Sequence, residues 1–118
     1  MRSTTAGAFD LDGINPLNTL AIVVAAGPDA RIVPAVAGLP DALFEDDGQI
    51  TKREIRAMTL AALAPRRGEL LWDVGAGSGS IGIEWMLADR SLRAIAIEAD
   101  PERAARAARN AALLGVPD

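Results

Sequence analysis

The stretch LLWDVGAGSGSIGIEW, residues 70–85, decides the fold. It places four glycines within eight positions directly after the apolar run 70–74. Glycine loses more backbone entropy on folding than any other residue, so a cluster of this kind needs a structural or functional reason. A short buried strand, a glycine loop and a helix over residues 80–88 are typical of open α/β sheets, which bind ligands at the carboxyl ends of their strands. The sequence therefore predicts a ligand site at this loop.

The segments that follow the loop complete a βαβ unit. Residues 93–98 are apolar nearly throughout, which predicts a parallel strand buried on both faces. Asp100 is the predicted N-cap of a last helix, with Pro101 in its first turn and Gly115 at its end. The predicted fold class is α/β, a Rossmann-like parallel sheet flanked by helices. Only the N-terminal part of such a domain is expected in this sequence, because two parallel strands cannot cover their own faces and edges.

A further helix is predicted before the first strand, in ITKREIRAMTLAALAP, where Pro65 ends it. Thr51 and Glu54 have the spacing of a capping box. The predicted apolar stripe of this helix consists of Ile55, Met58, Ala62 and Leu63.

The N-terminal third has a different composition. Residues 17–25, LNTLAIVVA, predict a strand, and residues 27–40, with three prolines, predict an extended linker. Asp10 and Asp12 precede the apolar patch and no cleavage site follows it, so a signal peptide is not expected. No run approaches the roughly 18 apolar residues that span a bilayer. The expected location is the cytoplasm.

Composition excludes several kinds of chemistry. The 118 residues include no Cys, His or Tyr, so no thiolate nucleophile, histidine base or ordinary zinc site is expected. The net charge of −4 argues against a nucleic-acid surface. The arginines of RAARAARN, at positions 103, 106 and 109, are interpreted as a solvated helix face.

The spacing of charged residues around the loop narrows the choice of ligand. Ser80 stands where the dinucleotide fingerprint has its third glycine, and the carboxylate of Asp73 would repel a pyrophosphate but suit an amino group. Glu98 follows Gly79 by 19 residues, which is the place of a carboxylate that accepts hydrogen bonds from ribose hydroxyls. S-adenosylmethionine fits this combination of groups.

These motifs resemble known proteins. LLWDVGAGSGSIGIE and AIAIEADPE resemble the first two motifs of class I S-adenosylmethionine-dependent methyltransferases. The longer stretch DGQITKREIRAMTLAALAPRRGELLWDVGAGSGS resembles the C-terminal, C15-methylating and decarboxylating domain of the precorrin-6Y C5,15-methyltransferase family of cobalamin biosynthesis. NPLNTLAIVVA resembles the closing strand of the tetrapyrrole methylase domain that precedes it in bifunctional members. The resemblance implies a domain remnant at 1–27, a linker at 28–45, and part of a methyltransferase domain at 46–118.

The resemblance also implies site residues and a reaction. Thr51 would touch the cofactor S-adenosyl-L-methionine, Asp73 would lie near its amino group, and Glu98 would accept hydrogen bonds from its ribose. The loop around its methionine part would be Gly75, Ala76, Gly77, Ser78 and Gly79. The implied reaction is methylation of a precorrin tetrapyrrole at C15, with loss of carbon dioxide from an acetate side chain. No catalytic residue is assigned, no metal, nucleic acid or membrane partner is expected, and the protein is expected to be a homo-oligomer.

Other interpretations stay open from the sequence alone. The glycines could serve only tight packing, Glu98 could be a solvated strand end, and Thr51 could be a helix cap and nothing more. Trp72 and Trp85 are expected in the core, and Asp100 and Glu102 are expected to stabilise a helix start. A nicotinamide oxidoreductase is disfavoured by Ser80 and Asp73. A folded scaffold without turnover is the other alternative.

Overall fold

The computed structural model describes residues 3–28, 30 and 32–116, which fall into two units that divide between residues 31 and 32. The first unit holds one short 3-10 helix, η1 (Ala6–Ala8), and is otherwise irregular. In the part of the chain that is described, no helix has the length and apolar character needed to cross a bilayer.

The strand predicted over residues 17–25 is wrong. This segment has irregular backbone, and its apolar side chains lie in solvent, with Val23 95% exposed. A strand is stabilised by pairing and by burial of a face, and no described strand pairs with this segment. Its β-branched composition alone does not form the element.

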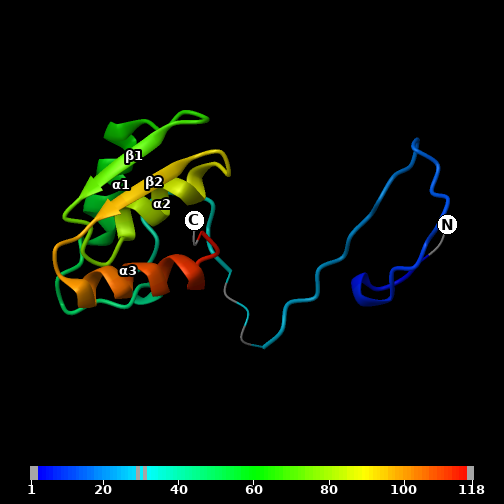
Figure 1. Ribbon diagram of the computed structural model, residues 1–118, viewed down its shortest axis with the longest axis horizontal. Helices are drawn as coiled ribbons and strands as arrows, with labels where there is room; N and C mark the ends of the chain where they lie inside the picture. Colours follow the sequence, from blue (N-terminus) through cyan, green and yellow to red (C-terminus); the bar gives the residue numbers. More distant parts are fainter. Residues whose placement is uncertain (1–2, 29, 31, 117–118) are drawn as a thin grey trace. The chain divides into compact units, whose positions relative to one another are not determined.

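The second unit is a βαβ arrangement with a preceding helix (Figure 1). The strands β1 (Leu70–Val74) and β2 (Arg93–Ile97) pair in parallel, with Leu70 opposite Arg93 and Val74 opposite Ile97. The remaining elements are η2 (Asp41–Leu43), α1 (Arg53–Leu63), α2 (Ser80–Ala88) and α3 (Pro101–Leu113). The βαβ prediction is confirmed, with the second strand one residue shorter than expected.

The start of α3 also follows the prediction. The Asp100 side chain accepts hydrogen bonds from the backbone amides of Glu102, at 2.8 Å, and Arg103, at 3.1 Å, and Pro101 occupies the first turn. These bonds satisfy amides that have no partner within the helix. Asp100 therefore serves as the expected cap.

The capping box predicted for α1 is wrong. The helix begins at Arg53, its N-cap is Lys52, and no side chain caps it. Thr51 lies one residue too early, and its carbonyl accepts a hydrogen bond from the buried Arg56 guanidinium. The guanidinium therefore fixes the chain entering the helix.

Within the described part of the second unit, helices cover one face of the sheet. Helix α2 packs against both strands and against α1 and α3. The opposite face is exposed and mostly apolar: it carries Leu70, Trp72, Val74, Ile95 and Ile97, with Arg93 opposite Leu70 at one end. Burial on both faces was therefore the wrong expectation for the second strand. Trp72, at 62% exposed, lies outside the core, whereas Trp85, at 4%, is buried as predicted.

The buried side of α1 carries an ion pair in place of the predicted apolar stripe. Arg56 is fully buried, and its Nε donates to Glu84 Oε1 at 2.7 Å, while its Nη1 donates to Asp41 at 2.7 Å. Leu60 shares this side. The predicted stripe faces solvent instead. A charged residue occupies the core because its guanidinium is fully paired there.

Glu84 also fixes the segment that was expected to be a linker. Its carboxylate accepts hydrogen bonds from the backbone amides of Gly38, at 2.6 Å, and Leu39, at 3.0 Å. The side chains of Leu39 and Phe44 are buried, and the Phe44 ring lies 4.9 Å from the Arg56 guanidinium carbon. Residues 38–44 are therefore part of the packed unit.

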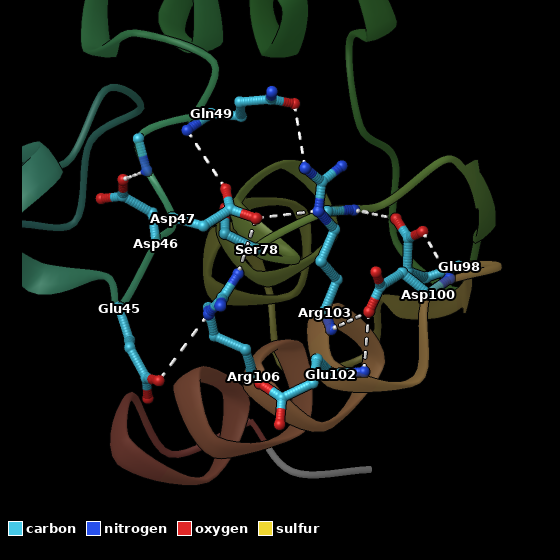
Figure 2. A network of polar contacts seen from close by, with 12 residues as sticks. Glu45, Asp46, Asp47, Gln49, Ser78, Glu98, Asp100, Glu102, Arg103 and Arg106 are labelled. Atoms are coloured by element: carbon cyan, nitrogen blue, oxygen red, sulfur yellow. Dashed lines mark hydrogen bonds and ion pairs between the residues drawn. The ribbon is translucent and has the colours of Figure 1, made fainter.

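The arginines of α3 are paired, not merely solvated; Figure 2 shows the contacts of Arg103 and Arg106. Arg103 and Arg106 contact the Asp47 carboxylate at 2.8 Å and 3.2 Å. Arg109 forms two hydrogen bonds to Glu45, at 2.9 Å and 2.6 Å. The Arg109 guanidinium lowers the pKa of Glu45, which stabilises its ionised form. These pairs hold residues 45–47 along α3.

The buried ion pair predicts a large stability difference between two similar substitutions. Arg56→Met leaves the Glu84 carboxylate buried without its cation, which is expected to lower the free energy of unfolding by about 3–5 kcal/mol. Arg67→Met removes an exposed pair with Asp89, 3.0 Å apart, and is expected to cost about 1 kcal/mol or less. Urea denaturation followed by circular dichroism measures both. Equal, small losses would contradict this account of the core.

Candidate functional site

The glycine loop joins the ends of the two parallel strands. Residues 75–79 connect β1 to α2. The backbone amides of Gly75 and Ala76 both donate to the carbonyl oxygen of Ile97, the last residue of β2, at 2.7 Å and 3.2 Å. The loop therefore lies at the carboxyl edge of the sheet and at the positive end of α2, where open α/β sheets bind their ligands.

The glycines of the loop have different reasons to be glycine. Gly75, Gly77 and Gly79 have φ angles of +80°, +57° and +75°, which disfavour any side chain. A Cβ at Gly79 would also lie 3.0 Å from the Ala107 Cβ, so packing against α3 requires glycine there. A Cβ at Gly75 would meet nothing within 4 Å, and one at Gly77 only the Gly75 carbonyl at 4.0 Å. Packing explains Gly79, but the space at the first two glycines is open to a ligand.

Glu98 lies directly at the loop. Its Oε2 accepts a hydrogen bond from the Gly77 amide at 2.8 Å, and its Oε1 accepts one from the Asp100 amide at 3.0 Å. These two backbone hydrogen bonds, that of Asp100 first, lower the pKa of Glu98. The side chain is partly exposed, and each carboxylate oxygen retains capacity for another donor. Glu98 is thus an ionised acceptor beside the loop.

Asp73 lies on the neighbouring strand. It is opposite Ala96 in the sheet, and its Oδ2 accepts a hydrogen bond from the Gly82 amide of α2 at 3.2 Å. Partial burial raises the pKa of Asp73, and the Gly82 amide opposes this shift. Asp73 therefore has a structural contact with the first turn of α2, and its carboxylate accepts no other hydrogen bond from the described residues.

The other predicted site residues differ in their relation to the loop. The Ala76 carbonyl accepts the Gly79 amide at 2.8 Å, which closes the loop, and Ser78 is buried within it. Thr51 is exposed, and among the described residues it has no hydrogen bond to the loop. The structure thus brings Glu98 and the glycine loop into direct contact, but not Thr51.

The direction of the loop amides limits what they can bind. Those of Gly75 and Ala76 point to the Ile97 carbonyl, and that of Gly77 points to Glu98. A pyrophosphate cradle uses free loop amides to bind an anion, whereas these three are already engaged. The geometry suits a ligand with hydroxyl and amino donors. No cluster of three potential metal ligands occurs in residues 3–28, 30 and 32–116.

One residue at the loop was missed by the sequence analysis. Asn110 of α3 is 1% exposed, and its Nδ2 donates to the Ser78 carbonyl at 2.9 Å. In the sequence it stands at the end of RAARAARN, where the arginines dominate the pattern. Asparagine is a poor former of helix interiors, and its position in an alanine-rich helix was the available signal.

Comparisons with known proteins identify the family of this chain. The family described as Precorrin methyltransferase domain matches residues 42–118. A precorrin-6Y C(5,15)-methyltransferase [decarboxylating] of Sinorhizobium sp is 67% identical over 95% of this chain and 27% of its own length. A probable cobalt-precorrin-6B C(15)-methyltransferase (decarboxylating) of Pyrobaculum calidifontis is 39% identical over 71% of this chain and 45% of its own.

Solved structures are similar as well. The C-terminal domain of precorrin-6Y C5,15-methyltransferase from Rhodobacter capsulatus has a TM-score of 0.66 at 53% identity, over 70% of this chain and 44% of that one. The precorrin-6Y C5,15-methyltransferase from Geobacter metallireducens has a TM-score of 0.67 at 31% identity, over 72% and 46%. The chain thus spans between about a quarter and a half of these relatives. Its α/β elements form part of the Rossmann-like methyltransferase fold, and the chain belongs to the precorrin methyltransferase domain family.

Proposed function

We propose that this chain is the cofactor-binding part of an S-adenosylmethionine-dependent methyltransferase that methylates a precorrin at C15 and decarboxylates its acetate side chain, in cobalamin biosynthesis. The observation that carries the proposal is the open space at Gly75 and Gly77 directly beside the ionised Glu98. This arrangement lies within the segment that matches the precorrin methyltransferase domain family.

The residues present fit the cofactor. Backbone without side chains at Gly75 and Gly77 lets a ligand approach the loop closely. Glu98 retains acceptor capacity for two ribose hydroxyls, and the free oxygen of Asp73 suits the amino group. When bound, S-adenosylmethionine supplies a methyl group on a sulfonium, which is transferred to a carbon nucleophile and leaves S-adenosylhomocysteine.

The role of the chain in this chemistry is to position the groups. Loop and strand ends would hold the cofactor in one orientation, so that a bound ring carbon lies in line with the methyl group. A glutamate is ionised at neutral pH, and the backbone amides of Asp100 and Gly77 lower the pKa of Glu98 further, so it binds hydroxyls without needing a proton change. Methyl transfer of this kind requires no histidine, in agreement with the composition.

Two observations disfavour a nicotinamide cofactor. The first three loop amides are engaged by Ile97 and Glu98, so they do not face a pyrophosphate. The Asp73 carboxylate adds a negative charge at the same edge. An adenosine with an amino acid chain and no phosphate is compatible with both observations.

The substrate and the domain organisation are proposed from the relatives. The family match over residues 42–118 and the similarity to the C-terminal domain of a precorrin-6Y C5,15-methyltransferase support assigning residues 46–118 to C15 methylation with decarboxylation. The Sinorhizobium protein, named for two methylations, matches 95% of this chain, so its similarity extends before this segment. This supports assigning residues 1–27 to the end of a preceding tetrapyrrole methylase domain, with 28–45 between them. The proposed location is the cytoplasm.

We further propose that the chain self-associates, because its sheet exposes a contiguous apolar face, which marks an interaction surface. Analytical ultracentrifugation is expected to show a homo-oligomer. Trp72→Lys, on that face, is expected to shift the chain toward monomer, whereas Met58→Lys, on the exposed side of α1, is not. A wild-type chain that sediments only as a monomer would contradict this proposal.

The cofactor proposal predicts that the chain binds S-adenosylhomocysteine through Glu98. Glu98→Gln removes the charge and one of its acceptor oxygens, and is expected to raise the dissociation constant by about tenfold to a hundredfold. Glu102→Gln makes the same change at an exposed carboxylate of α3 and is expected to leave the constant unchanged. Isothermal titration calorimetry measures both.

Equal affinity of the two variants would contradict the assignment of Glu98. Absence of binding to a wild-type chain that is folded by circular dichroism would favour the scaffold alternative. Turnover is tested by mass spectrometry of a precorrin incubated with the chain and S-adenosylmethionine. Binding without turnover is the result expected of a cofactor-binding part that needs further polypeptide. Gain of a methyl group and loss of carbon dioxide would show that the chain also carries the substrate site.

The raised pKa of Asp73 predicts a pH dependence of binding. Above this pKa the carboxylate is ionised and attracts the amino group of S-adenosylhomocysteine. As the pH falls through the pKa of Asp73, the carboxyl becomes neutral, and the affinity for S-adenosylhomocysteine is expected to fall. Asp73→Asn keeps an acceptor for the Gly82 amide but is expected to bind weakly at neutral pH and to lack this step. An identical pH profile in the variant would show that Asp73 does not contact the ligand.

A further inference from the structure

We infer that Asn110 is the positioning residue of the glycine loop: its buried carboxamide fixes the Ser78 peptide from the side of α3 and thereby sets the loop conformation that binds the cofactor. This inference rests on the proposed function for its ligand, but its structural part concerns the loop alone. No predicted site residue performs this task.

The contacts of Asn110 link the loop to a distant segment of the chain. Nδ2 donates to the Ser78 carbonyl at 2.9 Å and to the Glu45 carbonyl at 2.9 Å, and Oδ1 accepts from the Glu45 amide at 2.8 Å. The orientation of the carboxamide is fixed because both carbonyl partners can only accept and the amide can only donate. Three hydrogen bonds therefore determine one side-chain position, and the side chain is buried.

Contacts on either side of Ser78 explain why loss of the Asn110 hydrogen bond would affect the glycine loop in particular. Ala107 lies one helical turn before Asn110, on the same side of α3. It packs against the loop at Gly79, where an added Cβ would lie 3.0 Å from the Ala107 Cβ. Ser78 lies between Gly77, whose amide donates to Glu98, and Gly79, whose amide donates to Ala76. A Ser78 peptide held by Asn110 therefore constrains the peptides on both sides, including the amide that meets Glu98.

The segment around Glu45, which Asn110 links to the glycine loop, is stabilised by contacts that do not involve Ser78. Glu45 is paired with Arg109 through its side chain, while Asn110 binds its backbone. Arg109→Ala therefore loosens this segment without removing the bond to Ser78. It is the matched control for substitutions at Asn110, since the two residues are adjacent on α3.

The test uses Asn110→Asp, which keeps an acceptor for the Glu45 amide but loses both donors. Amide hydrogen exchange of the ligand-free chain, resolved by NMR, is expected to accelerate about tenfold or more at Gly77 and Gly79, as for loss of a buried hydrogen bond. Exchange at Leu60 in α1 reports unfolding of the whole unit and is expected to change less. Arg109→Ala is expected to leave the exchange rates of the Gly77 and Gly79 amides at their wild-type values.

The binding readout follows from the same change. Asn110→Asp is expected to raise the dissociation constant of S-adenosylhomocysteine about tenfold or more, and Arg109→Ala to leave it unchanged. If the wild type binds and Asn110→Asp binds equally well, with unchanged exchange at the two glycines, the inference is overturned. If Leu60 and the glycines accelerate equally, Asn110 stabilises the fold without a specific role at the loop. If the wild type does not bind, the proposed function fails, and the exchange data alone decide the inference.

Discussion

The hydrogen bond from the Gly77 amide to the Glu98 carboxylate is the contact on which the site depends. It joins the loop after β1 to the end of β2, and it exists because parallel pairing places Val74 opposite Ile97. Together with the bond from the Asp100 amide it lowers the pKa of Glu98, and it engages the Gly77 amide, which is then not available to an anion. A single geometric feature thus favours a ligand with hydroxyl donors over a phosphate ligand.

The segment before α1 is held to the helices by charged contacts as well as by the apolar packing of Leu39, Phe44 and Ile50. Arg56 and Glu84 are buried together, and Glu84 binds the amides at residues 38 and 39. The arginines of α3 pair with Glu45 and Asp47 further along the same segment. Buried pairs require complete hydrogen bonding, so they specify the position of this segment more precisely than apolar contacts would. Asn110 links this segment to the glycine loop, because its side chain bonds to both the Glu45 carbonyl and the Ser78 carbonyl.

The sequence predicted the elements with strong local signals. The glycine loop, both strands of the βαβ unit and the Asp100 cap follow from short-range patterns. The burial of Arg56 could not be predicted, because it depends on Glu84, which lies 28 residues away. Thr51 was misplaced as a cap because the helix begins one residue later than the capping-box pattern requires, with Lys52 as its N-cap, while Arg56 engages the Thr51 carbonyl. The strand expected at 17–25 failed because strand propensity has no effect without a partner, and Trp72 is exposed because no described element covers its face.

A crystal structure of the chain with S-adenosylhomocysteine would test the central claim most directly. The account predicts that the ligand lies against Gly75 and Gly77, that its ribose hydroxyls donate to Glu98, and that the loop keeps its positive φ angles. The bond between Gly77 and Glu98 should persist in the complex. A ligand bound elsewhere, or a loop that rearranges so that its amides face the ligand, would contradict the account.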